Sequence, residues 1–191
     1  MELILASQSP RRQELLGKMG LKFTVRPADI DETMDPADTP AHQVGLVSRR
    51  KATAAVAGPE DVVIAADTFV VVGDSILGKP LSPAEAAQML ERLSGRDHQV
   101  MTGCTVRRGD RMETFTEVTH MIFRPLSREE IDYYVSTGEP MDKAGAYGIQ
   151  GGAALFAEKM VGDYYNVMGL PVCRLWQLLS QIAPEIMEDI L

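Results

Sequence analysis

The longest apolar stretch of the chain, Val62 to Val72, constrains the fold more than any other segment. It is too short to cross a bilayer, so we expect it to lie at the centre of a buried sheet. Two polar residues, Asp67 and Thr68, interrupt the stretch. The sequence therefore predicts either two paired strands that meet at this point or one long bent strand.

Asp67 is the residue of this stretch whose burial costs the most free energy. A buried carboxylate needs a metal ion, a basic side chain or solvent at a strand end. A structural alternative is an aspartate in the turn between two hairpin strands. Hairpin turns usually contain glycine or asparagine, and Asp67-Thr68 has neither, so we favour a functional role for Asp67.

The remaining chain predicts helices and strands that interleave without strict alternation. Strands are expected at residues 3–6, 22–26, 98–107 and 112–123, with a hairpin around Gly162-Asp163, and helices at 10–19, 41–57, 83–93, 127–138 and 171–182. Two of these helices begin with the capping-box pairs Ser82/Glu85 and Ser127/Glu130. We expect a mixed sheet flanked by helices, hence an α/β fold.

Composition excludes several classes of protein. The 191 residues are 45% hydrophobic and 24% charged, which is typical of a single globular domain over residues 1–191. A net charge of −8 argues against a nucleic-acid partner, because nucleic-acid binding needs a basic face. No segment predicts a membrane span or a secretion signal, and Cys104 and Cys173 are expected to be reduced core thiols. We therefore expect a cytoplasmic protein.

The first predicted helix has the wrong charge at its start. Ser9-Pro10 is typical of a helix N-terminus, but Arg11 and Arg12 follow where acidic residues are favourable. A bound phosphate would explain them, because the helix N–H groups and a forked guanidinium both favour an anion. Two solvated surface arginines are an equally good interpretation of the local sequence.

Three further positions are candidates. Lys51 falls on the inward face of the 41–57 helix. It either belongs to a functional site or extends its ammonium group to solvent. Asp31 and Glu32 form an acidic pair in a loop, which either holds a divalent cation through oxygen atoms or is simply solvated.

Two glycine-rich stretches complete the candidates. Residues 138–152 contain five glycines, typical of a backbone that approaches a ligand or of a mobile loop, and Tyr147 and Gln150 there are suited to a nucleobase. Residues 73–80 nearly match a phosphate-binding P-loop, but Pro80 replaces the required Ser or Thr. We reject the P-loop and keep Lys79 as a phosphate contact.

Together these residues resemble one family. The resemblance to the Maf family is carried by five segments in the family's order: residues 7–12, 66–68, 78–80, 142–151 and 162–171. That family comprises nucleoside triphosphate pyrophosphatases (nucleoside triphosphate diphosphatases). The resemblance implies a fold like that of the inosine triphosphate pyrophosphatases: an elongated mixed sheet, helices on its sides, and two lobes with a central cleft.

The resemblance also implies a substrate. Arg11, Thr68 and Gln150 match the branch of the family that acts on dTTP and UTP. It implies hydrolysis to the nucleoside monophosphate and pyrophosphate, by water attack at the α-phosphorus, with Mg²⁺ or Mn²⁺, in a homodimer. A nucleotide-binding regulator of septum formation is the alternative function, and a phosphatase that releases orthophosphate is a third.

The expected site residues fall into three groups. The catalytic residues are Asp67, Lys51, Arg12 and Lys79; the substrate-binding residues are Ser7, Ser9, Arg11, Thr68, Lys143 and Gln150; the metal ligands are Asp67 with Asp31 or Glu32. The family makes the Asp67 position a proton acceptor. Asp67 would act either as that base or as a metal ligand.

Overall fold

The computed structural model describes residues 1–31, 33–35 and 37–188. The chain divides into two compact units. Unit 1 comprises Met1–Asp67, Thr102–Glu117 and Gly169–Leu191, and unit 2 comprises Thr68–Met101 and Val118–Met168. Because three segments form unit 1 and two form unit 2, each unit brings together residues that are far apart in the sequence.

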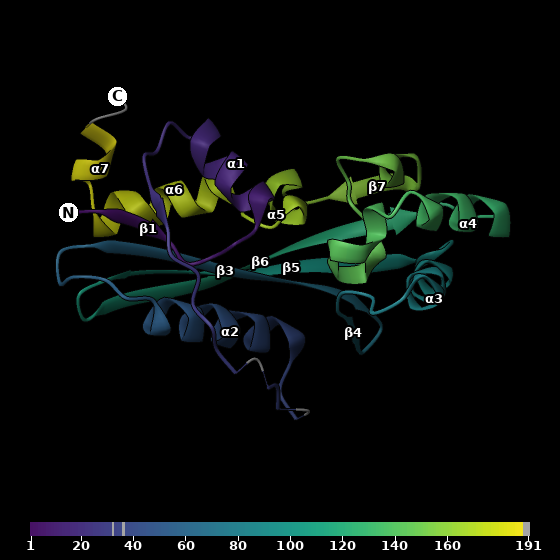
Figure 1. Ribbon diagram of the computed structural model, residues 1–191, viewed down its shortest axis with the longest axis horizontal. Coiled ribbons are helices and arrows are strands. Elements are labelled where there is room, and N and C mark those ends of the chain that lie inside the picture. The colour runs from purple at the N-terminus through teal and green to yellow at the C-terminus, as the bar shows by residue number, and fades with distance from the viewer. Residues whose placement is uncertain (32, 36, 189–191) are drawn as a thin grey trace. The chain divides into compact units, whose positions relative to one another are not determined.

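The strands form one mixed sheet of seven strands, as expected for an α/β fold (Figure 1). They are β1 (Leu3–Leu5), β2 (Thr24–Val25), β3 (Val62–Val72), β4 (Ser75–Leu77), β5 (Asp97–Arg108), β6 (Arg111–Phe123) and β7 (Ala157–Val161). The order is β2-β1-β3-β5-β6-β7, and β4 pairs with β3. β1 is parallel to β2 and β3, whereas β4 and β7 are antiparallel to their neighbours.

The central apolar stretch is one continuous strand, β3. Asp67 and Thr68 lie inside it, so the interpretation of Asp67 as a turn residue is wrong. Side chains alternate between the two faces of a strand. Val63 and Ala65 pack in one cluster with Ala52 of helix α2, and Asp67 continues their row on the same face.

The helices include the five that the sequence predicts, with ends shifted by a few residues, and several short ones that it does not predict. They are α1 (Pro10–Lys18), α2 (Pro40–Ala54), α3 (Pro83–Leu93), α4 (Arg128–Ser136), α5 (Tyr164–Met168), α6 (Val172–Ile182) and α7 (Glu185–Glu188), with the short helices η1 (Glu139–Asp142), η2 (Ala144–Ala146) and η3 (Gly152–Leu155). Capping explains two of the starts, since Ser82 accepts from Glu85 N and Ser127 forms a complete capping box with Glu130.

The hairpin expected around Gly162-Asp163 is wrong. These residues connect β7 to helix α5 rather than to another strand. Gly162 has a φ of 135°, and the Asp163 carboxylate accepts the Tyr165 N–H at 2.7 Å. A carboxylate that accepts a backbone N–H two residues later favours the start of a helix over the return of a strand.

Unit 1 has helices on both faces of its part of the sheet. Figure 1 shows α2 on one face and α1 and α6 on the other. α2 lies so close to β5 that a Cβ atom on Gly103 would be 2.3 Å from the carbonyl oxygen of Val44. The expectation of two core thiols is half wrong: Cys104 is buried, whereas Cys173 is exposed because it lies on the outer side of the amphipathic helix α6.

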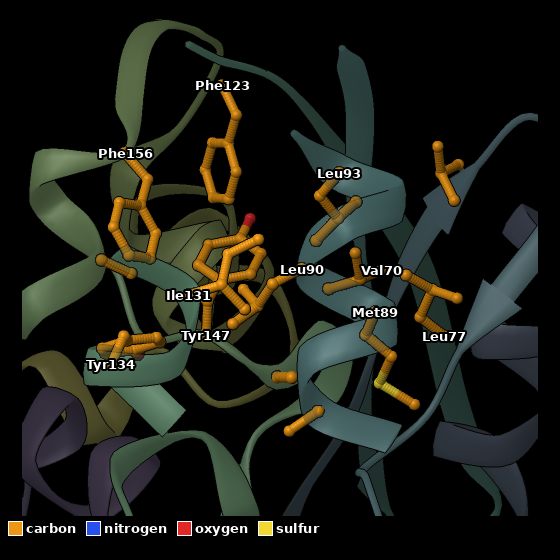
Figure 2. Close-up of a cluster of buried hydrophobic side chains, with 14 of the residues drawn as sticks. Val70, Leu77, Met89, Leu90, Leu93, Phe123, Ile131, Tyr134, Tyr147 and Phe156 are labelled. Atoms are coloured by element: carbon orange, nitrogen blue, oxygen red, sulfur yellow. The ribbon is translucent and has the colours of Figure 1, made fainter. Parts of the chain in front are cut away.

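Unit 2 has an aromatic core, shown in Figure 2, in which Phe123, Phe156 and Tyr147 make edge-to-face contacts. Tyr147 is 5% exposed and its hydroxyl is hydrogen-bonded to Nε2 of His98 at 2.8 Å. Burial lowers the pKa of His98 to about 4, so this histidine is neutral at pH 7. The expectation that Tyr147 stacks on a nucleobase is therefore wrong, because its ring is part of the core.

Replacement of Gly103 by Ala is expected to destabilise the protein by at least about 2 kcal/mol, because the new methyl group would overlap the backbone of α2. Gly17→Ala is the matched control: nothing lies within 4 Å of the added Cβ, and alanine favours a helix interior. Urea unfolding of both variants measures the difference. A Gly103→Ala variant as stable as wild type would contradict this packing.

Candidate active site

Arg12 is held inside unit 1 by two hydrogen bonds. Its Nε donates to the carbonyl oxygen of Gly169 at 2.8 Å, and its Nη1 donates to Oγ of Ser7 at 3.1 Å. Arg12 is 8% exposed and lies on the buried face of α1 with Leu15 and Leu16. Its charge is therefore fixed in position, which excludes the interpretation of Arg12 as a solvated surface arginine.

The N-terminus of α1 differs from those of three other helices. The N-cap residues of α2, α3 and α4 each accept a backbone N–H with their side chains, whereas Ser9 of α1 makes no such bond. The first turn of α1 contains no acidic residue, as in α2, and Arg11 there is only partly exposed. The positive end of this helix is thus suited to an anion.

The carboxylate in the apolar strand has a basic partner. Nζ of Lys51 donates to Oδ1 of Asp67 at 2.6 Å, and the two side chains are 15% and 17% exposed. Lys51 lies on α2, and Asp67 continues the row of Val63 and Ala65 on β3. The ion pair therefore lies next to the apolar contact between this helix and this strand. The inward position predicted for Lys51 is confirmed.

The expected metal ligands do not by themselves form a closed site. Asp31 is exposed, and its Oδ1 accepts the Thr33 N–H at 2.8 Å. Glu32 lies outside the described residues. In residues 1–31, 33–35 and 37–188 no group of three or more His, Cys, Asp or Glu side chains could hold a metal ion. Asp67 has a second carboxylate oxygen, Oδ2, so it fits a cation that is bound mainly by phosphate oxygens and water.

Two lysines lie on neighbouring segments of unit 2. Lys79 is exposed and follows Gly78, whose carbonyl oxygen accepts the Gly145 N–H at 3.0 Å. Lys143 lies two residues before Gly145, and its Nζ donates to the carbonyl oxygen of Glu139 and to Asp142 Oδ1, each at 2.7 Å. The Lys143 side chain therefore also helps to fold its own segment.

The end of the glycine-rich segment is a tight turn. The Gly151 N–H donates to the carbonyl oxygen of Gly148 at 3.1 Å, and Gln150 lies exposed within this turn. The close approaches of the glycines are to the protein itself: an added Cβ would be 2.8 Å from Val70 at Gly145 and 2.0 Å from Glu139 at Gly151. A ligand is thus not needed to explain these two glycines.

Each unit carries part of the expected site. Unit 1 contains Ser7, Ser9, Arg11, Arg12, Asp31, Lys51 and Asp67, and unit 2 contains Thr68, Lys79, Lys143 and Gln150. The structure shows Ser7 in contact with Arg12, and Lys51 in contact with Asp67. Nothing in the sequence indicates that Gly169 is a partner of Arg12 or that Glu139 is a partner of Lys143. Arg12 could have been placed in the core from its spacing, because it lies three and four residues before Leu15 and Leu16.

Curated relatives match nearly the whole chain. A protein of Symbiobacterium thermophilum named dTTP/UTP pyrophosphatase is 55% identical over 183 residues, which are 95% of this chain and 94% of the relative. Proteins with the same name from Moorella thermoacetica and Bacillus velezensis are 50% and 47% identical, and the match covers 94% of this chain in both cases and 94% and 95% of the relatives.

Solved structures support the fold. The Ham1 protein of Staphylococcus aureus matches with a TM-score of 0.54 at 17% identity, covering 95% of this chain and 99% of that one. A HAM1 protein of Coxiella burnetii gives a TM-score of 0.51 at 14% identity, with the same coverage. The model of the family described as "Maf-like protein" matches residues 2–182. The chain therefore belongs to the Maf-like family.

Proposed function

We propose that this protein hydrolyses dTTP and UTP to the nucleoside monophosphate and pyrophosphate. Relatives named dTTP/UTP pyrophosphatase share about half of its residues, and Arg11, Thr68 and Gln150 match the branch for these substrates. The observation that carries the proposal is the Lys51–Asp67 ion pair, which holds a carboxylate in place inside an otherwise apolar strand.

The triphosphate is proposed to bind to the cations and to the start of α1. Hydrolysis at the α-phosphorus requires stabilisation of the charge that develops on the pyrophosphate leaving group. Arg12 is fixed by Ser7 and Gly169, so no rotamer freedom has to be lost when it meets a phosphate. Arg11, Ser9, Lys79 and Lys143 complete the proposed set of phosphate contacts.

Asp67 is proposed to act on the attacking water or to bind the divalent cation. The Lys51 ammonium fixes the orientation of the carboxylate through Oδ1, and Oδ2 is the oxygen assigned to either role. Mg²⁺ or Mn²⁺, held by Asp67 with Asp31 or Glu32 and by the substrate, would supply charge neutralisation and a more acidic bound water.

The base is proposed to be read by Gln150 and Thr68. The edge of uracil and thymine presents carbonyl oxygens and an N3–H, which match the donor and acceptor of an amide. Gln150 lies exposed in a turn, and Thr68 follows Asp67 on the opposite face of β3. An amide held in one orientation disfavours cytosine, because cytosine has an acceptor at N3 and a donor at C4 where uracil has a donor and an acceptor.

The proposal includes a homodimer, which the family resemblance implies, and a cytoplasmic location, which the sequence composition favours. In the described part of the chain no helix is long and apolar enough to cross a membrane. A nucleotide-binding regulator of septum formation remains the second candidate function. It would use the cations of α1 in the same way, but it would have no need of the Lys51–Asp67 pair.

A panel of nucleoside triphosphates with Mg²⁺ or Mn²⁺ tests the proposal, with pyrophosphate and orthophosphate assayed separately. We expect pyrophosphate from dTTP and UTP and little product from CTP or the purine nucleotides. Binding without any product would favour the regulator, and orthophosphate as the first product would favour a phosphatase. Either result would overturn the proposed function.

Asp67→Asn is expected to lower kcat about 100-fold or more, because the change removes the charge required of a base or metal ligand. It leaves Lys51 beside a neutral amide, so a loss of about 1–3 kcal/mol in stability accompanies it. Asp74→Asn, at an exposed position after β3, is the matched control. Wild-type kcat in Asp67→Asn at saturating metal would remove Asp67 from both roles.

A further inference from the structure

We propose that Tyr134 and Glu139 form a pair that positions the Gln150 turn and thereby sets selectivity for the base. This inference rests on the proposed function, in which Gln150 reads the base. Neither residue is expected to touch the substrate, so both are positioning residues. The contacts of the pair with both ends of the turn carry the proposal.

Tyr134 provides a rigid support. It is 3% exposed on α4, and its ring makes an edge-to-face contact with Phe156 at a centroid distance of 5.1 Å (Figure 2). Its hydroxyl accepts the Gly148 N–H at 3.0 Å and donates to Oε1 of Glu139 at 2.8 Å. The first residue of the turn is thus tied to the aromatic core of unit 2.

Glu139 fixes the other end. Its Oε2 accepts the N–H of Gly152, the residue after the turn, at 3.1 Å. The carboxylate therefore accepts from two donors, the Tyr134 hydroxyl and the Gly152 amide, one on each oxygen. Removal of this carboxylate would therefore leave both donors without their acceptor.

The glycines around the pair fit this role. An added Cβ would be 2.0 Å from Oε1 of Glu139 at Gly151 and 3.2 Å from the Tyr134 ring at Gly152. At Gly148 it would be 2.5 Å from the Lys143 side chain, which itself donates to the Glu139 carbonyl. These glycines allow the backbone to wrap around Glu139, which explains why the turn contains so many of them.

The order in this turn matters for recognition of the base. A glycine-rich segment loses much conformational entropy when a ligand fixes it. The pair fixes both ends of the turn before any substrate binds, and Gln150 lies between these ends. The backbone of Gln150 is therefore held in place, and a fixed backbone limits the orientations in which its amide meets the base edge.

The first test measures how well the hydrogen bonds of the turn protect its backbone amides from exchange. Amide hydrogen exchange is followed by NMR in Tyr134→Phe, which removes the acceptor of the Gly148 N–H, and in Glu139→Ala, which removes the acceptor of the Gly152 N–H. We expect exchange at the turn to become about fivefold faster or more in both variants. The matched controls, Tyr133→Phe and Glu158→Ala, alter exposed residues of α4 and β7 and should leave it unchanged. Unchanged exchange in the folded test variants would overturn the positioning role.

The second test measures selectivity. The ratio of kcat/KM for UTP to that for CTP should fall about fivefold or more in Tyr134→Phe and Glu139→Ala. Neither change should alter this ratio in a Gln150→Ala background. An equal loss for both nucleotides, or a further loss in that background, would overturn action through Gln150. Wild-type protein that does not cleave UTP would instead refute the proposed function, while the exchange experiment still decides whether the pair holds the turn.

Discussion

A charged group inside an apolar strand must have a partner, and in this protein the partner is Lys51. Asp67 continues the row of β3 side chains that packs against α2, so the pair forms only if that helix and strand keep one register. The close approach of α2 to Gly103 on β5 fixes the helix on the sheet. The same packing that stabilises unit 1 therefore also sets the position of the carboxylate.

Local patterns in the sequence predicted the elements well. The apolar run gave β3, and the two capping boxes marked the starts of α3 and α4. Such features depend on residues a few positions apart, which the sequence displays directly. The prediction of a hairpin around Gly162 was wrong because it also used only local residues. A turn signal does not indicate whether a strand or a helix follows it.

The contacts that hold the candidate site in place depend on distant residues. Arg12 and Gly169 are separated by 157 positions, and nothing local to either one indicates the other. Tyr147 was misassigned because an aromatic residue in a glycine-rich stretch has the same local pattern whether it faces a ligand or the core. Its contacts with His98 and Phe123, which are distant in the sequence, show that it faces the core.

The glycine-rich segment illustrates how such a pattern is ambiguous. Several of its glycines make room for the protein's own Val70, Glu139 and Lys143. The segment is therefore ordered by internal contacts, which the family resemblance did not indicate. We propose that positive charge on α1 and a fixed carboxylate on β3 provide the chemistry, and that an ordered turn provides the selectivity.

The central claim is that water attacks the α-phosphorus of a pyrimidine nucleoside triphosphate. Hydrolysis of UTP in water carrying heavy oxygen, followed by mass spectrometry of both products, tests it most directly. Our account predicts that the label enters UMP and that the pyrophosphate remains unlabelled. Label in the pyrophosphate would mean attack at the β-phosphorus and would contradict the account.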